Sequence, residues 1–238
     1  MKSDYTEYNF KRGIERINQI IDTPDAKYEE LEKLPTRDSL TYTNGFHVKC
    51  AALFVVIRDP AELTDLHRNN RLAKLYRIYL SEVTAVMNGN SKCAEINIAG
   101  TCISGFFDAP WQDDLNEVFS TVGKISSIVR IINQRFSDCP IKIGIGLSYG
   151  KALLVKVGYK GTKLGEVIWV GDVVSEASRL ASYANKEPAD RETMVSEIVY
   201  HNLDDENKKL LAFNSARDCY HGSVVNKHMN NLYKQNYP

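Results

Sequence analysis

One stretch in the C-terminal half of the chain carries a pair of side chains suited to an anionic group. Ser175 and Arg179 stand four residues apart in GDVVSEASRLASYA, so on a helix they share one face. A guanidinium is always charged and matches a spread negative charge. The pair therefore indicates an anion-binding face, with an ordinary surface arginine as the alternative.

A second candidate region is the predicted hairpin at residues 93–107, two short strands joined by a tight turn. Thr101 follows Gly100 at its tip, and Asn97 lies near the end of its first strand. A carboxamide both donates and accepts hydrogen bonds, so Asn97 suits contact with a polar ligand, or it is a polar residue at a strand end. The tip of this hairpin carries no carboxylate.

Most of the sequence patterns that mark other catalytic chemistries are absent. The chain has no P-loop, no GxSxG elbow and no GxGxxG that opens a helix, and its five histidines lie far apart. The Gly-Ile-Gly at residues 144–146 lies inside a predicted strand. There it indicates close packing of another backbone against the strand.

The elements that must position these residues alternate between strands and long helices. Hydrophobic spacing predicts a strand at 48–57, a helix at 71–87, the hairpin and a helix from about 114 to 136. A strand pair bent at Tyr149-Gly150 follows, and then a strand at 166–170 and a helix at 171–184. The chain continues with a strand followed by a helix at 193–203 and ends with a final strand. This order predicts an α+β fold, a ferredoxin-like antiparallel sheet with helices on one side.

An N-terminal segment differs from this core in composition. Ile14, Ile17, Ile20 and Ile21 have helical spacing, and the following residues 23–46 are polar with two prolines, which predicts a linker. We therefore expect an N-terminal helix and linker over 1–46 and a single domain over 47–238.

Composition limits the classes of function. Of 238 residues, 43% are hydrophobic and 25% are charged, which suits one globular domain with a short appendage. The 30 basic residues balance the 30 acidic ones, so charge favours neither nucleic-acid nor membrane binding. The polar N-terminus predicts no signal peptide, and five scattered cysteines predict reduced thiols in the cytoplasm.

Four ordered stretches resemble the class III nucleotide cyclases over roughly residues 48–185. They are ALFVVIRD, EINIAGTCISGFFDAP, IKIGIGLSYG and VIWVGDVVSEASRLAS. Within that family, HRNNRLAKLYRIYLSEV and FFDAPWQDD resemble the bacterial Pycsar-type pyrimidine cyclases. The resemblance implies a class III cyclase homology domain that makes cyclic UMP or cyclic CMP in antiphage signalling.

The resemblance also implies a two-metal site in which carboxylates hold Mn²⁺ or Mg²⁺. The two metal-binding aspartates of the family align with Val56 and Thr101, and a backbone-carbonyl ligand aligns with Ile57. Both carboxylates are therefore missing, so we expect weak or absent turnover. Asp59 lies three residues past the first of these positions.

Other family positions bear on the substrate. Arg179 aligns with the arginine that stabilises the pentavalent phosphorus, and Ser175 aligns with the asparagine that positions the ribose. The purine-reading lysine aligns with Asn97, and the purine-reading aspartate or threonine aligns with Ile168. The absence of both purine-reading groups fits a pyrimidine or a base that is not read, and Asn97 cannot by itself choose uracil over cytosine. We expect a pyrimidine nucleoside triphosphate as the substrate, with UTP favoured over CTP.

Two further residues are candidates for nucleotide contacts. Phe54 would line the phosphate or base site, with burial in the core as the alternative. Lys227 follows the last predicted strand and would meet the triphosphate, with a solvated lysine as the alternative.

Three classes of function follow from these observations. The first is an active pyrimidine cyclase that uses other ligands, and the second is an inactive cyclase-fold protein that binds a nucleotide or a partner. The third is a structural dimerisation module. Because the family is implied to build each site from two subunits, we expect a homodimer in which Val56 and Thr101 face Ser175 and Arg179 of the other protomer.

Overall fold

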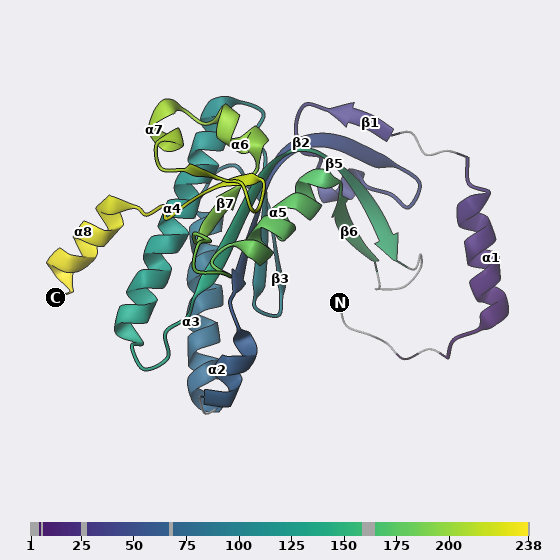
Figure 1. Ribbon diagram of the computed structural model, residues 1–238. Coiled ribbons are helices and arrows are strands. Elements are labelled where there is room, and N and C mark those ends of the chain that lie inside the picture. The colour runs from purple at the N-terminus through teal and green to yellow at the C-terminus, as the bar shows by residue number, and fades with distance from the viewer. Residues whose placement is uncertain (1–4, 6, 25–27, 67–68, 159–164, 238) are drawn as a thin grey trace.

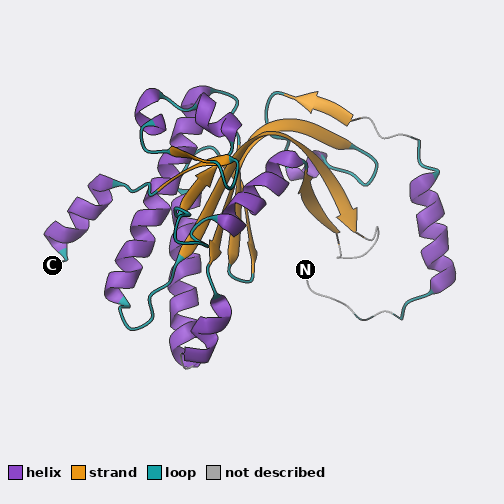
Figure 2. Ribbon diagram, in the orientation of Figure 1, coloured by secondary structure: helices purple, strands orange, loops and turns teal. Residues whose placement is uncertain are grey.

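The computed structural model describes residues 5, 7–24, 28–66, 69–158 and 165–237. These residues form a nine-stranded sheet in the order β3-β4-β2-β5-β7-β9-β8, with β1 paired to β2 and β6 paired to β5. Helices cover both faces of the sheet (Figures 1 and 2). The predicted α+β class is confirmed.

The elements have the following bounds. The strands are β1 (Tyr28–Leu31), β2 (Gly45–Ile57), β3 (Cys93–Ala99), β4 (Cys102–Phe107), β5 (Ile143–Gly158), β6 (Gly165–Val170), β7 (Thr193–Val195), β8 (Ala212–Asn214) and β9 (Cys219–Gly222). The helices are α1 (Phe10–Ile21), α2 (Pro60–Leu66), α3 (Asn69–Asn88), α4 (Gln112–Arg135), α5 (Asp172–Tyr183), α6 (Glu197–Asn202), α7 (Asp205–Lys208) and α8 (Lys227–Asn236), and a short 3₁₀ turn covers Arg37–Ser39. Among the described helices, none combines the length and apolar character that crossing a bilayer requires. His67 and Arg68, which begin the stretch HRNN, lie outside the described residues.

The side chains of β2 alternate between two apolar layers. Leu53, Val55 and Ile57 belong to the main core, together with the inner faces of α3 and α4. Cys50 and Ala52 point the other way and pack with Val173 and Ala177 of α5. The helices therefore cover both faces of the sheet (Figure 1), and the prediction of helices on one side is wrong for α5.

The strand β5 runs without interruption through the predicted bend at Tyr149-Gly150. It pairs with β2 along the whole length of that strand, from Ile57 opposite Ile143 to Gly45 opposite Val155. The predicted strand pair is therefore wrong, because the chain curves here instead of turning back. The outer halves of β2 and β5, together with β1 and β6, form a curved extension that we call the arm (Figure 1).

The segment predicted as a linker contributes to the arm. Tyr28–Leu31 forms β1, which pairs in parallel with Gly45–Val48 of β2, so this part of the linker prediction is wrong. The alternation of Tyr28-Glu-Glu-Leu31 is too short to indicate a strand without its partner. The N-terminal helix that the spacing of the isoleucines predicted is present as α1. It stands away from the sheet (Figure 1), and its isoleucines are exposed to solvent.

The glycines of β5 allow α5 to lie directly on the sheet, as their position in a strand predicted. A Cβ atom at Gly146 would come within 2.1 Å of the Ala177 carbonyl oxygen, and one at Gly144 within 2.5 Å of the Ala181 carbonyl oxygen. Both contacts are to the backbone of α5, which has no flexible end that could move aside. The position of α5 on the sheet therefore depends on these two glycines.

We predict that Gly146→Ala lowers the free energy of unfolding by about 3 kcal/mol, because α5 must lift from the sheet to admit the methyl group. Urea unfolding followed by circular dichroism measures this change. Gly150→Ala is the matched control on the same strand, since its Cβ would lie 3.5 Å from Val173, an ordinary contact. Equal stability of the two variants would contradict the packing that places α5.

Candidate functional site

The strand register places Asn97 and Phe54 in one row across the sheet. Asn97 pairs with Ser104, Ser104 with Phe54, and Phe54 with Gly146. Residues directly opposite each other on antiparallel strands share a face, and Gly146 lies under α5. Asn97 and Phe54 therefore lie on the face of the sheet that α5 partly covers.

Phe54 belongs to a row of aromatic rings that leads towards β6. Its ring meets Phe106 edge-on with centroids 6.3 Å apart, and Phe106 stacks on Trp169 at 4.3 Å. Phe54 is half-buried beside the small core under α5, so it packs as a core residue with one part of its ring exposed. Ile168 alternates with Val167 and Trp169 on β6 and is 37% exposed.

The three positions that the resemblance assigns to metal lie at one end of the sheet. Val56 lies two residues beyond Phe54, on the same face, half-buried and opposite Gly144. Ile57 buries its side chain in the main core on the other face. Thr101 is half-buried in the turn after Gly100, whose φ of 62° fits the first central residue of a type II′ hairpin.

The buried hydroxyl of Tyr79 holds the hairpin tip beside the end of β2. Its oxygen lies 3.3 Å from the Thr101 carbonyl oxygen and 3.5 Å from the Val55 carbonyl oxygen. Burial raises the pKa of Tyr79, with a further contribution from Cys102, so the hydroxyl keeps its proton and donates. The fold therefore brings Thr101 next to the strand of Val56, as the family arrangement requires.

These residues do not fit a divalent cation. The described residues contain no group of three or more His, Cys, Asp or Glu side chains that could hold a metal ion. The side chain of Val56 has no donor atom, and Thr101 offers one neutral hydroxyl, whereas such cations prefer carboxylate oxygens. Asp59 is exposed in a left-handed conformation, with φ of 48°, beyond Arg58.

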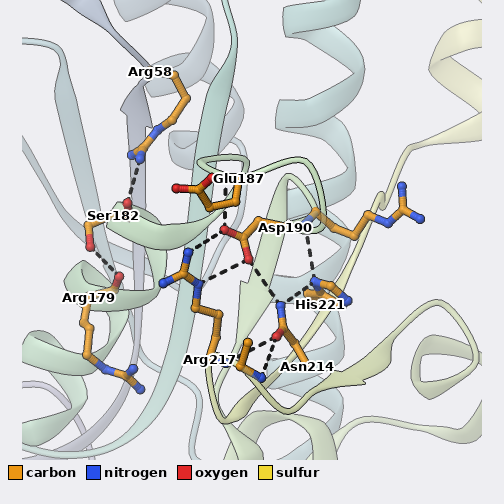
Figure 3. A network of polar contacts seen from close by, with 10 residues as sticks. Arg58, Arg179, Ser182, Glu187, Asp190, Asn214, Arg217 and His221 are labelled. Carbon is orange, nitrogen blue, oxygen red and sulfur yellow. Dashed lines mark hydrogen bonds and ion pairs between the residues drawn. The ribbon is translucent and has the colours of Figure 1, made fainter.

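Arg58 fixes the end of β2 to α5 (Figure 3). Its Nη1 donates to the Ser182 carbonyl oxygen at 2.7 Å, and its Nη2 donates to the Ala181 carbonyl oxygen at 2.8 Å. A positive charge at the C-terminal end of a helix is stabilising. Burial lowers the pKa of Arg58, and the nearby Asp59 opposes this change. The strand of Val56 and the helix of Arg179 therefore form one rigid unit within the protomer.

Ser175 and Arg179 both lie on the outer face of α5, exposed to solvent. The guanidinium of Arg179 forms an ion pair with Glu176 at 3.4 Å and lies 5.7 Å from the ring centroid of Tyr183. Because α5 turns its small residues towards the sheet, this pair points away from it. The predicted shared face is present and is open to a ligand or to a second protomer.

A buried polar network lies beside the C-terminal end of α5, and sequence patterns did not indicate it. Arg217 contacts the Asp190 carboxylate through Nε at 3.3 Å and Nη2 at 3.0 Å, and Asn214 adds a hydrogen bond at 3.3 Å (Figure 3). Arg217 also lies 4.6 Å from the centroid of Tyr183, the ring that Arg179 approaches. The network therefore supports the ring beside Arg179.

The Asp190 carboxylate should make folding stability depend on acidity. Burial alone would raise the pKa of Asp190, but hydrogen bonds from Arg217, the Glu187 amide and Asn214 together lower it below its ordinary value. A carboxylate with a lowered pKa stabilises the fold above its unfolded pKa near 4, and this contribution is lost as the pH falls through the folded value. Neutral His221 acts in the same direction at higher pH, because burial and Arg191 lower its pKa.

We predict that Asp190→Asn lowers the free energy of unfolding at pH 7, since the Asp190 carboxylate is buried and holds Arg217 and Asn214 in place. The variant should also lose the part of the acid destabilisation that lies below pH 4. Urea unfolding between pH 3 and pH 7 tests both effects. If the free energy of unfolding of Asp190→Asn fell below pH 4 as steeply as that of the parent protein, Asp190 would not be the source of the pH dependence.

Lys227 lies apart from the other candidates within one protomer. It is exposed at the start of α8, and the preceding residue Asn226 is hydrogen-bonded to Gly123 and Ser127 of α4. Because α4 covers the face of the sheet opposite α5, the structure does not bring Lys227 to the Arg179 side. A contact between Lys227 and a triphosphate stays a prediction.

Comparisons with known proteins bear on the family and the fold. No protein-family model matches the chain. A uridylate cyclase of Gulbenkiania mobilis is 29% identical over 98% of this chain and 96% of its own length. A uridylate cyclase of Treponema porcinum is 32% identical over 90% of this chain and 77% of its own length. Among solved structures, the guanylyl cyclase Cya2 superposes with a TM-score of 0.58 at 20% identity, over 72% of this chain and 84% of that protein, which shows a shared fold.

Proposed function

The chain belongs to the class III nucleotide cyclase family, alongside relatives named uridylate cyclase, and from this premise we propose that it is a pyrimidine nucleotide cyclase with slow turnover. The reaction would convert UTP, in preference to CTP, into the cyclic monophosphate. The single observation that carries this proposal is the exposed pair Ser175 and Arg179 on α5, one helical turn apart and held over the sheet by glycine contacts.

The chemistry assigns these side chains separate roles. The ribose 3′-oxygen attacks the α-phosphorus and loses its proton to solvent, while the bond from that phosphorus to the bridging oxygen breaks and pyrophosphate leaves. Arg179 would donate hydrogen bonds to the oxygens of the pentavalent phosphorus as negative charge develops there. Ser175 would contact the ribose, with a shorter reach than the asparagine of the family.

The two base-reading positions support a pyrimidine. Asn97 is an exposed carboxamide and Ile168 an exposed apolar side chain, so neither supplies the lysine or the aspartate or threonine that the family is implied to use for a purine. The partly buried ring of Phe54 lies in the same row of the sheet as Asn97, with Ser104 of β4 between them. A uracil or cytosine base, which needs neither purine-reading group, suits these positions better than adenine or guanine.

The metal positions support low turnover. Because the described residues place no carboxylate at Val56 or Thr101 and no acidic cluster elsewhere, the site lacks the anionic ligands that the family chemistry uses. The same observation favours a second candidate function, an inactive cyclase-fold protein that binds a nucleotide. The resemblance to Pycsar cyclases supports a role in antiphage signalling in the cytoplasm for either one.

A homodimer completes the proposal. Arg179 points away from the sheet that carries Val56 and Thr101, so a second protomer placed against α5 would join the two halves of the site. The exposed isoleucines of α1 would be covered in the same assembly. A two-fold arrangement would give two equivalent composite sites.

A thermal-shift measurement combined with a product assay tests the proposed function. UTP should raise the melting temperature of the protein, with ATP giving a smaller shift, and cyclic UMP should accumulate slowly with Mn²⁺. A shift by UTP with no product would favour the nucleotide-binding alternative. The absence of a shift with every nucleoside triphosphate would overturn both in favour of a structural module.

A further inference from the structure

The segment before β2 carries a guanidinium that joins two strands of the sheet. Arg37 lies in the short 3₁₀ turn at Arg37–Ser39. Its Nη2 lies 3.0 Å from the Glu95 carboxylate on β3, and its Nη1 lies 3.0 Å from the Glu166 carboxylate on β6. Since β3 and β6 are not neighbours in the sheet, Arg37 connects two strands that share no ladder.

Each of the two glutamates lies two residues before a proposed base-reading position on its own strand. Glu95 comes two residues before Asn97, and Glu166 comes two residues before Ile168. Side chains two residues apart on a strand point to the same side. One guanidinium in contact with both carboxylates therefore ties the side of β3 that carries Asn97 to the strand β6. The side chain of Ile168 lies on the other side of β6 from Trp169, whose ring stacks on Phe106.

Glu95 also fixes the direction of the Asn97 carboxamide. The Nδ2 of Asn97 donates to Oε1 of Glu95 at 2.9 Å, the same oxygen that meets Arg37. An ionised carboxylate only accepts hydrogen bonds, so the amide nitrogen and not the carbonyl oxygen must face it. The side chain of Glu95 is 11% exposed, which leaves it few solvent partners. The Asn97 carbonyl oxygen is thus turned away from Glu95, where it can accept a hydrogen bond from a ligand.

We propose that Arg37 is a positioning residue for base recognition, acting through Glu95 on Asn97 and through Glu166 on the strand of Ile168. The contacts of Arg37 with Glu95 and of Glu95 with Asn97 present the Asn97 carbonyl oxygen to a ring N–H donor such as N3–H of uracil. This inference rests on the proposed function, because that function assigns base reading to Asn97 and Ile168.

A double-mutant cycle with UTP binding as the readout tests the proposal. Arg37→Gln should weaken UTP binding in calorimetry by about tenfold. Arg37→Lys should weaken it less, because the ammonium keeps the positive charge although it does not span two carboxylates as a fork does. In an Asn97→Ala background, Arg37→Gln should have little further effect, since residues that act through one another are not additive. Lys151→Gln is the matched control, because it breaks an ion pair with Glu30 in the same arm and should leave UTP binding unchanged.

A measurement without nucleotide separates this inference from the proposed function. In the nitrogen-15 NMR spectrum, the side-chain NH₂ signal of Asn97 is identified by its loss in Asn97→Ala. Arg37→Gln should shift that signal, and Lys151→Gln should not. An unmoved signal, or an equal loss of UTP affinity with and without Asn97, would overturn the positioning role. If the parent protein bound no nucleoside triphosphate, the proposed function would fail while the NMR result still decided whether Arg37 orients Asn97.

Discussion

The double substitution Val56→Asp with Thr101→Asp is expected to raise Mn²⁺-dependent formation of cyclic UMP by about a thousandfold or more. A metal ion that stabilises the charge of a transition state contributes several kcal/mol, and each 1.4 kcal/mol corresponds to about a tenfold change in rate. The remaining parts of the proposed site, Ser175 and Arg179 on α5, are already in place. Product formation from UTP, measured with and without a chelator, gives the result.

The fold should tolerate both carboxylates. Val56 and Thr101 are half-exposed, so an aspartate at either position keeps contact with water. Each single substitution should restore little, because the two metal ions are implied to share both carboxylates. The double substitution Val56→Asn with Thr101→Asn is the matched control, since it has the shape of the aspartates without their charge.

Two outcomes would contradict this prediction. Rapid turnover of UTP by the parent protein would mean that Val56 and Thr101 do not occupy the metal site, and Asp59 would become the first residue to test. A double variant that folds and binds Mn²⁺ but remains silent with all four nucleoside triphosphates would mean that the site has lost more than these two ligands.

A mixture of two chains that are each nearly inactive is expected to recover activity. One chain is the parent, which has Arg179 and lacks the carboxylates, and the other carries Val56→Asp, Thr101→Asp and Arg179→Ala. If each site takes its carboxylates from one protomer and its arginine from the other, half of the dimers in an equal mixture are mixed, and each mixed dimer has one intact site. The mixture should therefore show about a quarter of the activity of the double-aspartate variant at the same total concentration.

The controls for this experiment separate the location of the site from damage to the fold. Each chain alone should show no more than the slow turnover of the parent, and the triple variant should still bind UTP, because Arg179 acts mainly on the transition state. Parent protein that itself carries Arg179→Ala should give no recovery in the mixture. A silent mixture, with subunit exchange verified by sedimentation of labelled chains, would place the whole site within one protomer.

Much of the fold was predictable from local patterns in the sequence. The spacing of apolar residues located α3 and α4 closely, because each buries a broad stripe of side chains against one face of the sheet. The hairpin of β3 and β4 followed from the glycine at its tip. The glycines at 144 and 146 indicated close backbone packing, although not which helix would supply it.

The parts that were missed depend on partners far away in the chain. β1 is defined only by its pairing with β2, and Arg37 finds Glu166 129 residues later. Asp190 and Arg217 have no periodic spacing that would connect them. The continuity of β5 was missed because Tyr149-Gly150 resembles a turn, whereas the neighbouring strand β2 keeps the backbone extended there. Charged side chains in polar segments carry no local signal of their partner, so these contacts required the fold.

The unbroken course of β5 has a consequence for motion. A domain that closes over its ligand usually bends at a few loop residues that absorb the change in backbone angles. Here one continuous strand leads from the central sheet into the arm, β2 runs beside it, and Arg58 fastens the end of β2 to α5. Among the described residues, the continuous strand β5 and the Arg58 contacts therefore leave no loop between the central sheet and the arm at which the two could bend. In the homodimer proposed above, opening and closing around a nucleotide would then come from one protomer moving against the other, and the rates of substrate entry and product release would be set at the subunit interface.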